Sequence, residues 1–345
     1  MFPGYKLIMR GGKIFMKYGL IVFEDSFNLG DDIQSYAAEQ FLPHTDYVVD
    51  REDLDAFYTE SGERAAVILG GWFLYHHLNW PPSPFIKPLP VSMHFDTFYS
   101  RVAGEKLTRN FVLEDYGAAW LIENGPVGCR DHNTKELLEK YGIPGYFSGC
   151  LTLTIEPFQG VNNHGEICLV DVPEDVAVFI RKNAGQGVKE LTHAVKLSAL
   201  EWGQRRRLVA ERLRLYQGAS LVVTTRLHAA LPCLALGVPV LLIKENWSLN
   251  RLGTWLEYVN CCPKEQLLSG EYTYDFDRPE GNPQKYKELS ESLKKICTDF
   301  VRGCEVGPEE KLDVAMFLEE NKRVKRLQKL MALRIDKYER ELYGH

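Results

Sequence analysis

The stretch Ser220 to Ile243, SLVVTTRLHAALPCLALGVPVLLI, decides the fold of this chain. It opens with an apolar run, Ser220 to Thr224, whose β-branched residues predict a buried strand. A helix rich in Ala and Leu is expected from Arg226 to Leu236, and Gly237-Val238-Pro239 bounds a second strand, Val238 to Ile243. A strand, a helix and a strand in this order are typical of a parallel sheet, so the sequence predicts an α/β protein.

The same alternation continues on both sides of this stretch. In the first half, strands are expected at 18–23, 46–50, 65–69, 91–95 and 126–129, and helices at 31–42, 52–59, 116–123 and 133–141. In the second half, strands are expected at 166–172 and 188–191, and helices at 173–183 and 197–216. Two doubly wound units are therefore predicted, with a cleft between the carboxyl ends of their strands.

A polar segment with two glycines, 157–165, is the expected linker. We therefore predict an N-terminal Rossmann-like domain over 16–156, a C-terminal one over 165–305, and a helical tail over 306–345. The tail reads as a basic amphipathic helix with interspersed Glu, which favours packing on the protein over peripheral membrane contact. Homo-oligomerisation stays open. Residues 1–15 are expected to be an upstream extension without function.

Composition excludes several classes of protein. The chain has 345 residues, 45% of them hydrophobic, and a formal net charge of −6, which suits a globular enzyme and argues against a nucleic-acid partner. The eight cysteines show no C-x-x-C spacing and read as reduced core residues. The longest apolar run, Leu231 to Ile243, is short of the ~20 residues that cross a bilayer, and no signal peptide is evident. We expect a cytoplasmic enzyme without metal or cofactor.

The sharpest chemical signal is Arg226-Leu227-His228, where the strand runs into the first turn of the helix. Unpaired backbone N–H groups and the positive end of the helix dipole favour an anion there. Arg226 adds a bidentate donor and His228 a titratable one. The turn predicts a phosphate or carboxylate site, although Arg226 capping an acidic helix and His228 as a core histidine are the structural alternatives.

A second cationic turn, Gly128-Cys129-Arg130-Asp131, follows a strand in the first half. Arg130 occupies the same position between a strand and a helix as Arg226. The two arginines are therefore expected to bind one small anion from opposite sides of the predicted cleft. Asn133 or Thr134 is the expected cap of the next helix. The alternative is a surface turn with an ion pair between Arg130 and Asp131.

Two further sites lie at expected strand ends. His94 closes the strand 91–95 and is a candidate acid, base or ligand, or else a histidine buried among aromatic residues. In Asn28-Leu29-Gly30-Asp31-Asp32, Gly30 permits a tight turn, and Asp31 or Asp32 is expected to cap the next helix. The functional reading is that these polar groups bind sugar hydroxyls, with Asp31 or Asp32 taking a proton from one.

These motifs, in their order along the chain, resemble the polysaccharide pyruvyl transferase family over roughly residues 18 to 260. The matching segments are Asn28-Leu29-Gly30-Asp31-Asp32, Gly128-Cys129-Arg130-Asp131, Ser148-Gly149-Cys150-Leu151-Thr152-Leu153-Thr154, and Thr225-Arg226-Leu227-His228-Ala229-Ala230 with Gly237-Val238-Pro239. The resemblance implies a fold like that of glycosyltransferase-B enzymes. It also implies transfer of pyruvate from phosphoenolpyruvate to two sugar hydroxyls as a cyclic ketal in exopolysaccharide or cell-surface glycan biosynthesis.

The resemblance assigns roles to residues. Arg226, Leu227, His228, Arg130 and Arg251 are expected to bind phosphoenolpyruvate, which is the donor substrate rather than a cofactor. His228, Asp31 and His94 are the candidate catalytic residues. Asn28, Gly30 and Trp72 are the candidate acceptor-binding residues, for a glycan or a lipid-linked sugar. The aromatic, Pro-rich stretch from Gly71 to Pro90 departs from the family's shorter turn, and this leaves the acceptor open.

Two other functions remain. A glycosyltransferase with a nucleotide-sugar donor would share the fold. However, the only glutamates between residues 218 and 260 are Glu245 and Glu257, which lack the spacing of two helical turns expected of such an enzyme. A non-catalytic glycan-binding protein would keep the aromatic residues but has no need for converging Arg226, His228 and Arg130.

Overall fold

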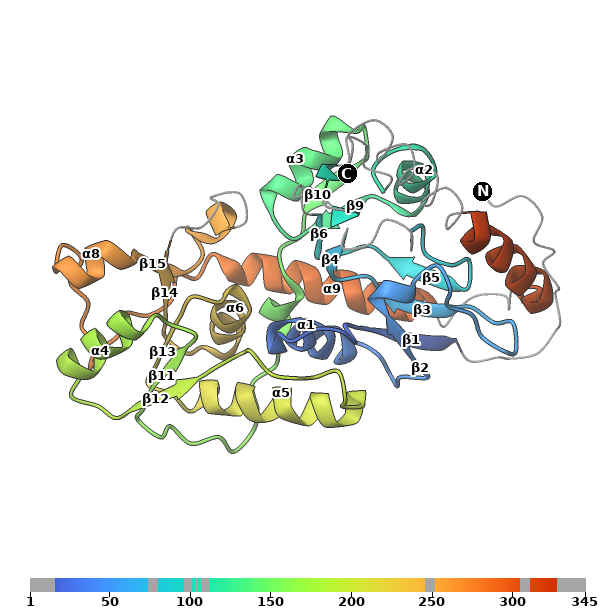
Figure 1. The fold of residues 1–345 in the computed structure, drawn as a ribbon. Coiled ribbons are helices and arrows are strands. Elements are labelled where there is room, and N and C mark those ends of the chain that lie inside the picture. The colour runs from blue at the N-terminus through green and yellow to red at the C-terminus, as the bar shows by residue number, and fades with distance from the viewer. Residues whose placement is uncertain are drawn as a thin grey trace.

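The computed structural model describes residues 16–73, 80–95, 101–102, 105–106, 112–245, 252–304 and 311–327. The chain is a mixed α/β protein whose sheets are parallel apart from one short hairpin, β7 (Arg101–Val102) with β8 (Glu105–Lys106). This agrees with the predicted Rossmann-like fold class. Figure 1 shows the strands of the two halves on either side of α1 (Leu29–Glu39) and α6 (Leu227–Leu236).

The first half holds two four-stranded sheets that continue into one another. The first sheet has the strand order β2 (Tyr47–Asp50), β1 (Lys17–Val22), β3 (Ala65–Ile68), β5 (Ile86–Leu89). The second has the order β10 (Gly145–Phe147), β9 (Val127–Cys129), β6 (Met93–Phe95), β4 (Gly71–Phe73). The pairing of β3 with β5 resumes as β4 with β6 beyond short breaks in both strands. Gly71 and Ser92, with φ of 139° and 57°, lie at these breaks. Strands β4 and β5 lie in the stretch that the sequence presented as a Pro-rich loop.

The helices of the first half begin close to their predicted positions, with one exception. They are α1, α2 (Asp115–Asn124) and α3 (His132–Lys140). The predicted helix over 52–59 is wrong: the structure has only a 3₁₀ turn, η1 (Arg51–Asp53). The Asp50 carboxylate takes the backbone N–H of Glu52, and Leu54 is the only apolar residue of this segment that is fully buried. Too little apolar surface is buried there to sustain a longer helix.

The second half is one five-stranded parallel sheet. Its order is β12 (Val188–Leu191), β11 (Ile167–Val170), β13 (Leu221–Thr224), β14 (Val240–Lys244), β15 (Asn260–Pro263). Its helices are α4 (Glu174–Asn183), α5 (Trp202–Gln217), α6, η4 (Gly253–Trp255) and α8 (Lys264–Ser269). The strand order reverses between β11 and β13, and the carboxyl ends of strands at such a reversal are where open α/β sheets bind ligands.

One hydrophobic cluster spans both halves, and each half has a further cluster of its own. The cluster that contains Ile33 of α1 also contains Leu213 of α5 and Ala230 of α6. The crossing segment η3 (Leu151–Thr154) packs against α1, α6 and the long helix α9 (Tyr286–Cys304). Helix α9 extends from the second half toward β3 of the first half (Figure 1). Near its carboxyl end, Val301 packs with Tyr18 and Ala66. Residues 155–166 form no regular element; the predicted division into domains at this linker stays a prediction.

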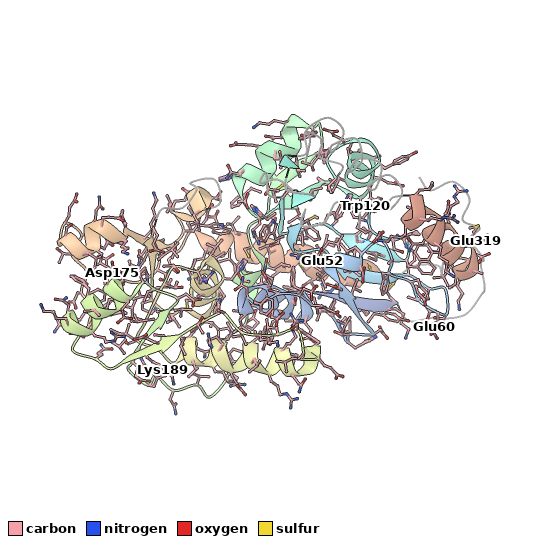
Figure 2. All side chains as sticks on the ribbon, viewed as in Figure 1. Glu52, Glu60, Trp120, Asp175, Lys189 and Glu319 are labelled. Atoms are coloured by element: carbon pink, nitrogen blue, oxygen red, sulfur yellow. The ribbon has the colours of Figure 1, made fainter. Side chains whose placement is uncertain are left out.

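A helix over 314–327 packs on the first half. Phe317 lies on Phe85, with ring centroids 5.0 Å apart, and Lys325 pairs with Asp55 at 2.7 Å. In Figure 2, Glu319 of this helix lies at the opposite end of the molecule from Asp175 and Lys189. Residues 328–345 lie outside the described part, so membrane contact through the tail stays a prediction.

Among the described helices, none is long and apolar enough to span a bilayer. All eight cysteines lie in the described part of the chain, and seven of them are buried.

Candidate active site

The first turns of α1 and α6 lie against each other. A Cβ atom on Gly30 would lie 3.0 Å from Cβ of His228, so a larger residue would require the two helices to move slightly apart. Gly30 lies inside α1 rather than in the tight turn we predicted. The N-cap is Asn28, whose side chain accepts a hydrogen bond from the Gly30 N–H at 3.1 Å. The predicted capping by Asp31 or Asp32 is wrong, because the helix begins earlier, at Leu29.

The two aspartates of α1 have different environments. Asp32 is fully buried and forms an ion pair with Arg205 of α5, which also donates to the backbone oxygen of Phe23. Asp32 therefore joins the two halves. Asp31 is half-buried and accepts a hydrogen bond from the Ser26 hydroxyl at 2.6 Å. Its environment leaves Asp31, rather than Asp32, as the candidate for contact with substrate.

Arg130 is a buried cation at the carboxyl end of β9. Its side chain is buried, with the residue 1% exposed, and Nη1 donates a hydrogen bond to Oε1 of Gln34 at 2.9 Å. Nε and Nη2 have no hydrogen-bond acceptor among the described residues. The surface-turn alternative is wrong, because neither Arg130 nor Asp131 is on the surface. A buried guanidinium with two nitrogens that lack an acceptor is suited to binding an anion.

His94 and Asp131 form a buried pair beside Arg130. Nδ1 of His94 lies 2.5 Å from Oδ2 of Asp131, and Oδ1 accepts from the backbone N–H of Thr134 at 2.9 Å. Asp131 is thus the N-cap of α3, in place of Asn133 or Thr134. Burial alone would raise the pKa of Asp131, but its hydrogen bond to His94 and the positive charges nearby hold it below its usual value. Trp72 of β4 flanks His94, with ring centroids 6.5 Å apart.

His228 and Arg226 stand at the start of α6 in different settings. His228, in the first turn, is buried, whereas the Arg226 side chain is 48% exposed. Nε of Arg226 donates to Oδ2 of Asp171 at 2.9 Å, just beyond β11. Burial raises the pKa of Asp171, but hydrogen bonds from Thr192 and the backbone of His193, together with the charge of Arg226, lower it overall. Arg226 therefore pairs with a carboxylate at the strand reversal rather than with an acidic helix.

A loop of the second half holds the start of α1. The backbone oxygen of His193 accepts from Leu29 N at 2.9 Å, and Val195 N donates to the oxygen of Phe27 at 3.0 Å. The His193 ring is buried and bonds through Nε2 to the Tyr216 hydroxyl at 2.7 Å. Burial lowers the pKa of His193 to about 3, so its imidazole is neutral near pH 7. This histidine supports the site without carrying charge.

The structure brings most of the predicted residues together. Contacts run from His228 through Gly30 to Gln34 and Arg130. Asp131, the next residue after Arg130, contacts His94, and the His94 ring lies beside Trp72. Leu227 is half-buried beside Arg226, and Arg251 lies outside the described residues.

Four residues of the site were missed from the sequence: Gln34, Asp131, Asp171 and His193. Only two of them carried a usable signal. Asp131 directly follows Arg130 at a strand end, and Asp171 falls at the end of an apolar run that becomes β11. Gln34 and His193 carry no such signal, because their partners are distant in the sequence.

This arrangement can bind an anion and move a proton. Arg130 supplies a buried positive charge, and the His94–Asp131 pair is the arrangement of a histidine whose ring is oriented by a carboxylate.

Among known proteins, the family model described as polysaccharide pyruvyl transferase matches residues 28–246. No curated protein matches the chain. A functionally uncharacterised protein of Klebsiella pneumoniae subsp. pneumoniae NTUH-K2044 has a similar solved structure, with 13% identity, 68% of this chain and 85% of that chain covered, and a TM-score of 0.37.

Proposed function

The chain belongs to the polysaccharide pyruvyl transferase family, and from that premise we propose that it transfers pyruvate from phosphoenolpyruvate to two hydroxyls of one sugar. The product is a cyclic ketal on a glycan or a lipid-linked sugar, made for an exopolysaccharide or another cell-surface glycan. Phosphoenolpyruvate is the donor substrate, and the proposed reaction uses no further cofactor.

One observation carries the proposal: two nitrogens of the buried Arg130 guanidinium, Nε and Nη2, have no acceptor in the described structure. A cation in the interior is costly unless an anion accompanies it. Phosphoenolpyruvate carries a carboxylate and a phosphate, and either group accepts two parallel N–H bonds from arginine. Arg130 therefore binds the donor in our proposal, and Arg226 and Arg251 contribute to the phosphate side.

The reaction removes one proton from each of two sugar hydroxyls and delivers one proton to carbon and one to the leaving phosphate. A proton adds to the methylene carbon of phosphoenolpyruvate, which becomes the methyl group, and the neighbouring carbon becomes electrophilic. One sugar hydroxyl adds to that carbon. The C–O bond to phosphate then breaks, and the second hydroxyl adds in its place. The two hydroxyl protons balance the new C–H bond and the protonated phosphate that leaves.

The buried histidines supply the acid in this scheme. His94 is oriented by Asp131, and a neighbouring carboxylate stabilises the protonated imidazole that a general acid needs. His228 lies at the positive end of α6, where it contacts the phosphate or acts as an alternative acid. Asp31, half-buried beside Asn28, is the proposed base for a sugar hydroxyl. Asn28, Gly30 and Trp72 are the proposed acceptor-binding residues.

Binding of phosphoenolpyruvate, measured by isothermal titration, tests the donor without knowledge of the acceptor. We expect wild type to bind and Arg130→Met to lose roughly 100-fold or more in affinity, as for the loss of a buried charged hydrogen-bond donor. Arg226→Ala and His228→Ala should weaken binding as well. Arg207→Ala is the control, because this arginine is exposed on α5 and should leave binding unchanged. If the folded wild type does not bind phosphoenolpyruvate but binds a nucleotide sugar, the result would instead support a glycosyltransferase function.

A further inference from the structure

We propose that Gln34 is a positioning residue that orients Arg130 and, because it is uncharged, leaves the positive charge of Arg130 to the donor anion. The inference rests on the proposed function only in taking phosphoenolpyruvate as the ligand. It assigns a role to a buried amide of α1 that no motif indicates.

The amide of Gln34 is held at both ends. The residue is 3% exposed, and Oε1 accepts from Nη1 of Arg130 at 2.9 Å. Nε2 lies 3.4 Å from Oδ1 of Asp31 and 3.5 Å from the backbone oxygen of Gly30. Oxygens on the Nε2 side require a donor there, so the amide oxygen must face the arginine. Gln34 thus links Arg130 to Asp31, the proposed base.

This contact selects which edge of the guanidinium stays open. The group is planar and rigid, and Nε–H and one Nη2–H point in the same direction, which is the geometry that binds a carboxylate or phosphate in a bidentate manner. Gln34 occupies Nη1, on the other side. The two nitrogens without an acceptor in the described structure are Nε and Nη2. Gln34 therefore turns the bidentate edge of Arg130 toward the ligand.

The neutral charge of Gln34 also matters. Asp131 follows Arg130 in the chain and interacts with its charge, but the hydrogen bonds of its two oxygens go to Thr134 N and to Nδ1 of His94 rather than to the guanidinium. A glutamate at position 34 has the same shape as glutamine and would form a buried ion pair with Arg130, competing with the donor for its charge. It would also place a second carboxylate next to Asp31. Glutamine keeps the hydrogen bond and avoids both effects.

Two variants separate orientation from charge, with affinity for phosphoenolpyruvate measured by isothermal titration. Gln34→Met removes the hydrogen bond to Arg130 without adding charge, and we expect affinity to fall about 10-fold. Gln34→Glu restores an oxygen acceptor but adds charge, and we expect a fall of roughly 100-fold. The control is Gln40→Glu, the same change at the end of the same helix, where the amide bonds to Thr154 instead. Gln40→Glu should bind the ligand within about threefold of wild type.

A double-mutant cycle distinguishes positioning from a general structural role. Arg130→Lys keeps the positive charge but loses the planar guanidinium. This variant should bind phosphoenolpyruvate about 10- to 30-fold more weakly than wild type, an affinity that titration can still measure. If Gln34 acts through the guanidinium, Gln34→Met should change affinity less than threefold in the Arg130→Lys background. An equal effect of Gln34→Met in both backgrounds, or wild-type binding by Gln34→Glu, overturns the inference. Failure of wild type to bind phosphoenolpyruvate would instead refute the proposed function.

Discussion

Nδ1 of His94 lies 2.5 Å from Oδ2 of Asp131, and the two residues are only 4% and 1% exposed. A carboxylate accepts hydrogen bonds only, so the proton of a neutral imidazole sits on Nδ1, and in the proposed reaction Nε2 is the atom that exchanges protons. The other oxygen of Asp131 caps α3. One side chain therefore starts a helix and orients a candidate acid.

Asp131→Asn separates these two tasks. Asparagine is as good an N-cap as aspartate, so α3 should keep its start. The amide cannot fix the same proton on His94 or stabilise its charged form, and we expect kcat to fall about 10²- to 10⁴-fold. The KM for phosphoenolpyruvate should change far less. Steady-state kinetics with the purified variant checks this, and activity within threefold of wild type would exclude the role of His94 as the acid.

The stability of Asp131→Asn provides a control that depends on pH. The folded pKa of Asp131 lies below the ordinary value of 3.8, so its charged form stabilises the fold above that pH. This contribution is lost as the pH falls through the lowered folded pKa. The difference in free energy of unfolding between wild type and variant should thus be present at neutral pH and shrink below about pH 4.

Arg205→Ala should destabilise the junction of the two halves. Its partner, Asp32, is fully buried, and burial raises the pKa of this carboxyl even though Arg205 opposes the shift. Removing the cation leaves an uncompensated charge, at a cost of about 3–5 kcal/mol. Protonation relieves that cost, so urea denaturation should show a smaller deficit at pH 5 than at pH 8. A deficit below about 1 kcal/mol at pH 8 would show that the pair does not join the halves.

Gly30→Ala and Gly203→Ala are a matched pair, because each glycine is the second residue of its helix. Around Gly203 nothing lies within 4 Å of an added Cβ, so alanine should leave stability unchanged or raise it by up to about 1 kcal/mol. At Gly30 the new methyl would lie 3.0 Å from Cβ of His228. We expect a loss of about 1–3 kcal/mol and weaker binding of phosphoenolpyruvate. Thermal unfolding and titration of both variants test this, and equal behaviour would refute the tight contact.

Phe317→Ala tests whether the helix over 314–327 contributes to stability but not to ligand binding. Phe317 is 4% exposed and packs on Phe85, which is fully buried. Truncation should cost about 3 kcal/mol in urea denaturation. Binding of phosphoenolpyruvate by the folded variant should not change, because these residues contact none of the site. Leu327→Ala, exposed on the same helix, is the control and should stay within about 0.5 kcal/mol of wild type. A loss of ligand affinity in Phe317→Ala alone would show that this helix is coupled to the site.

The elements that carry the site were largely predictable from local patterns. Apolar runs with helical patterns between them indicated β1, β9, β11 and β13, and the polar residues at their ends indicated Asn28, Arg130 and Arg226. Strands β4 and β5 were missed because three or four residues carry too little periodicity, and Pro88 argued against a strand. Their pairing with distant strands outweighs that local preference.

The sequence by itself determined the α/β class, the order of the motifs and the strand ends at which charged groups stand. The tertiary structure alone decided the partners: Arg130 with Gln34, 96 residues away, His94 with Asp131, and Arg226 with Asp171. The physical reason is that hydrophobic periodicity records which face of an element is buried, and this is a local property. Which side chains then meet depends on strand order and on the packing of α1 against α6, so the open edge of Arg130 exists only in the folded chain.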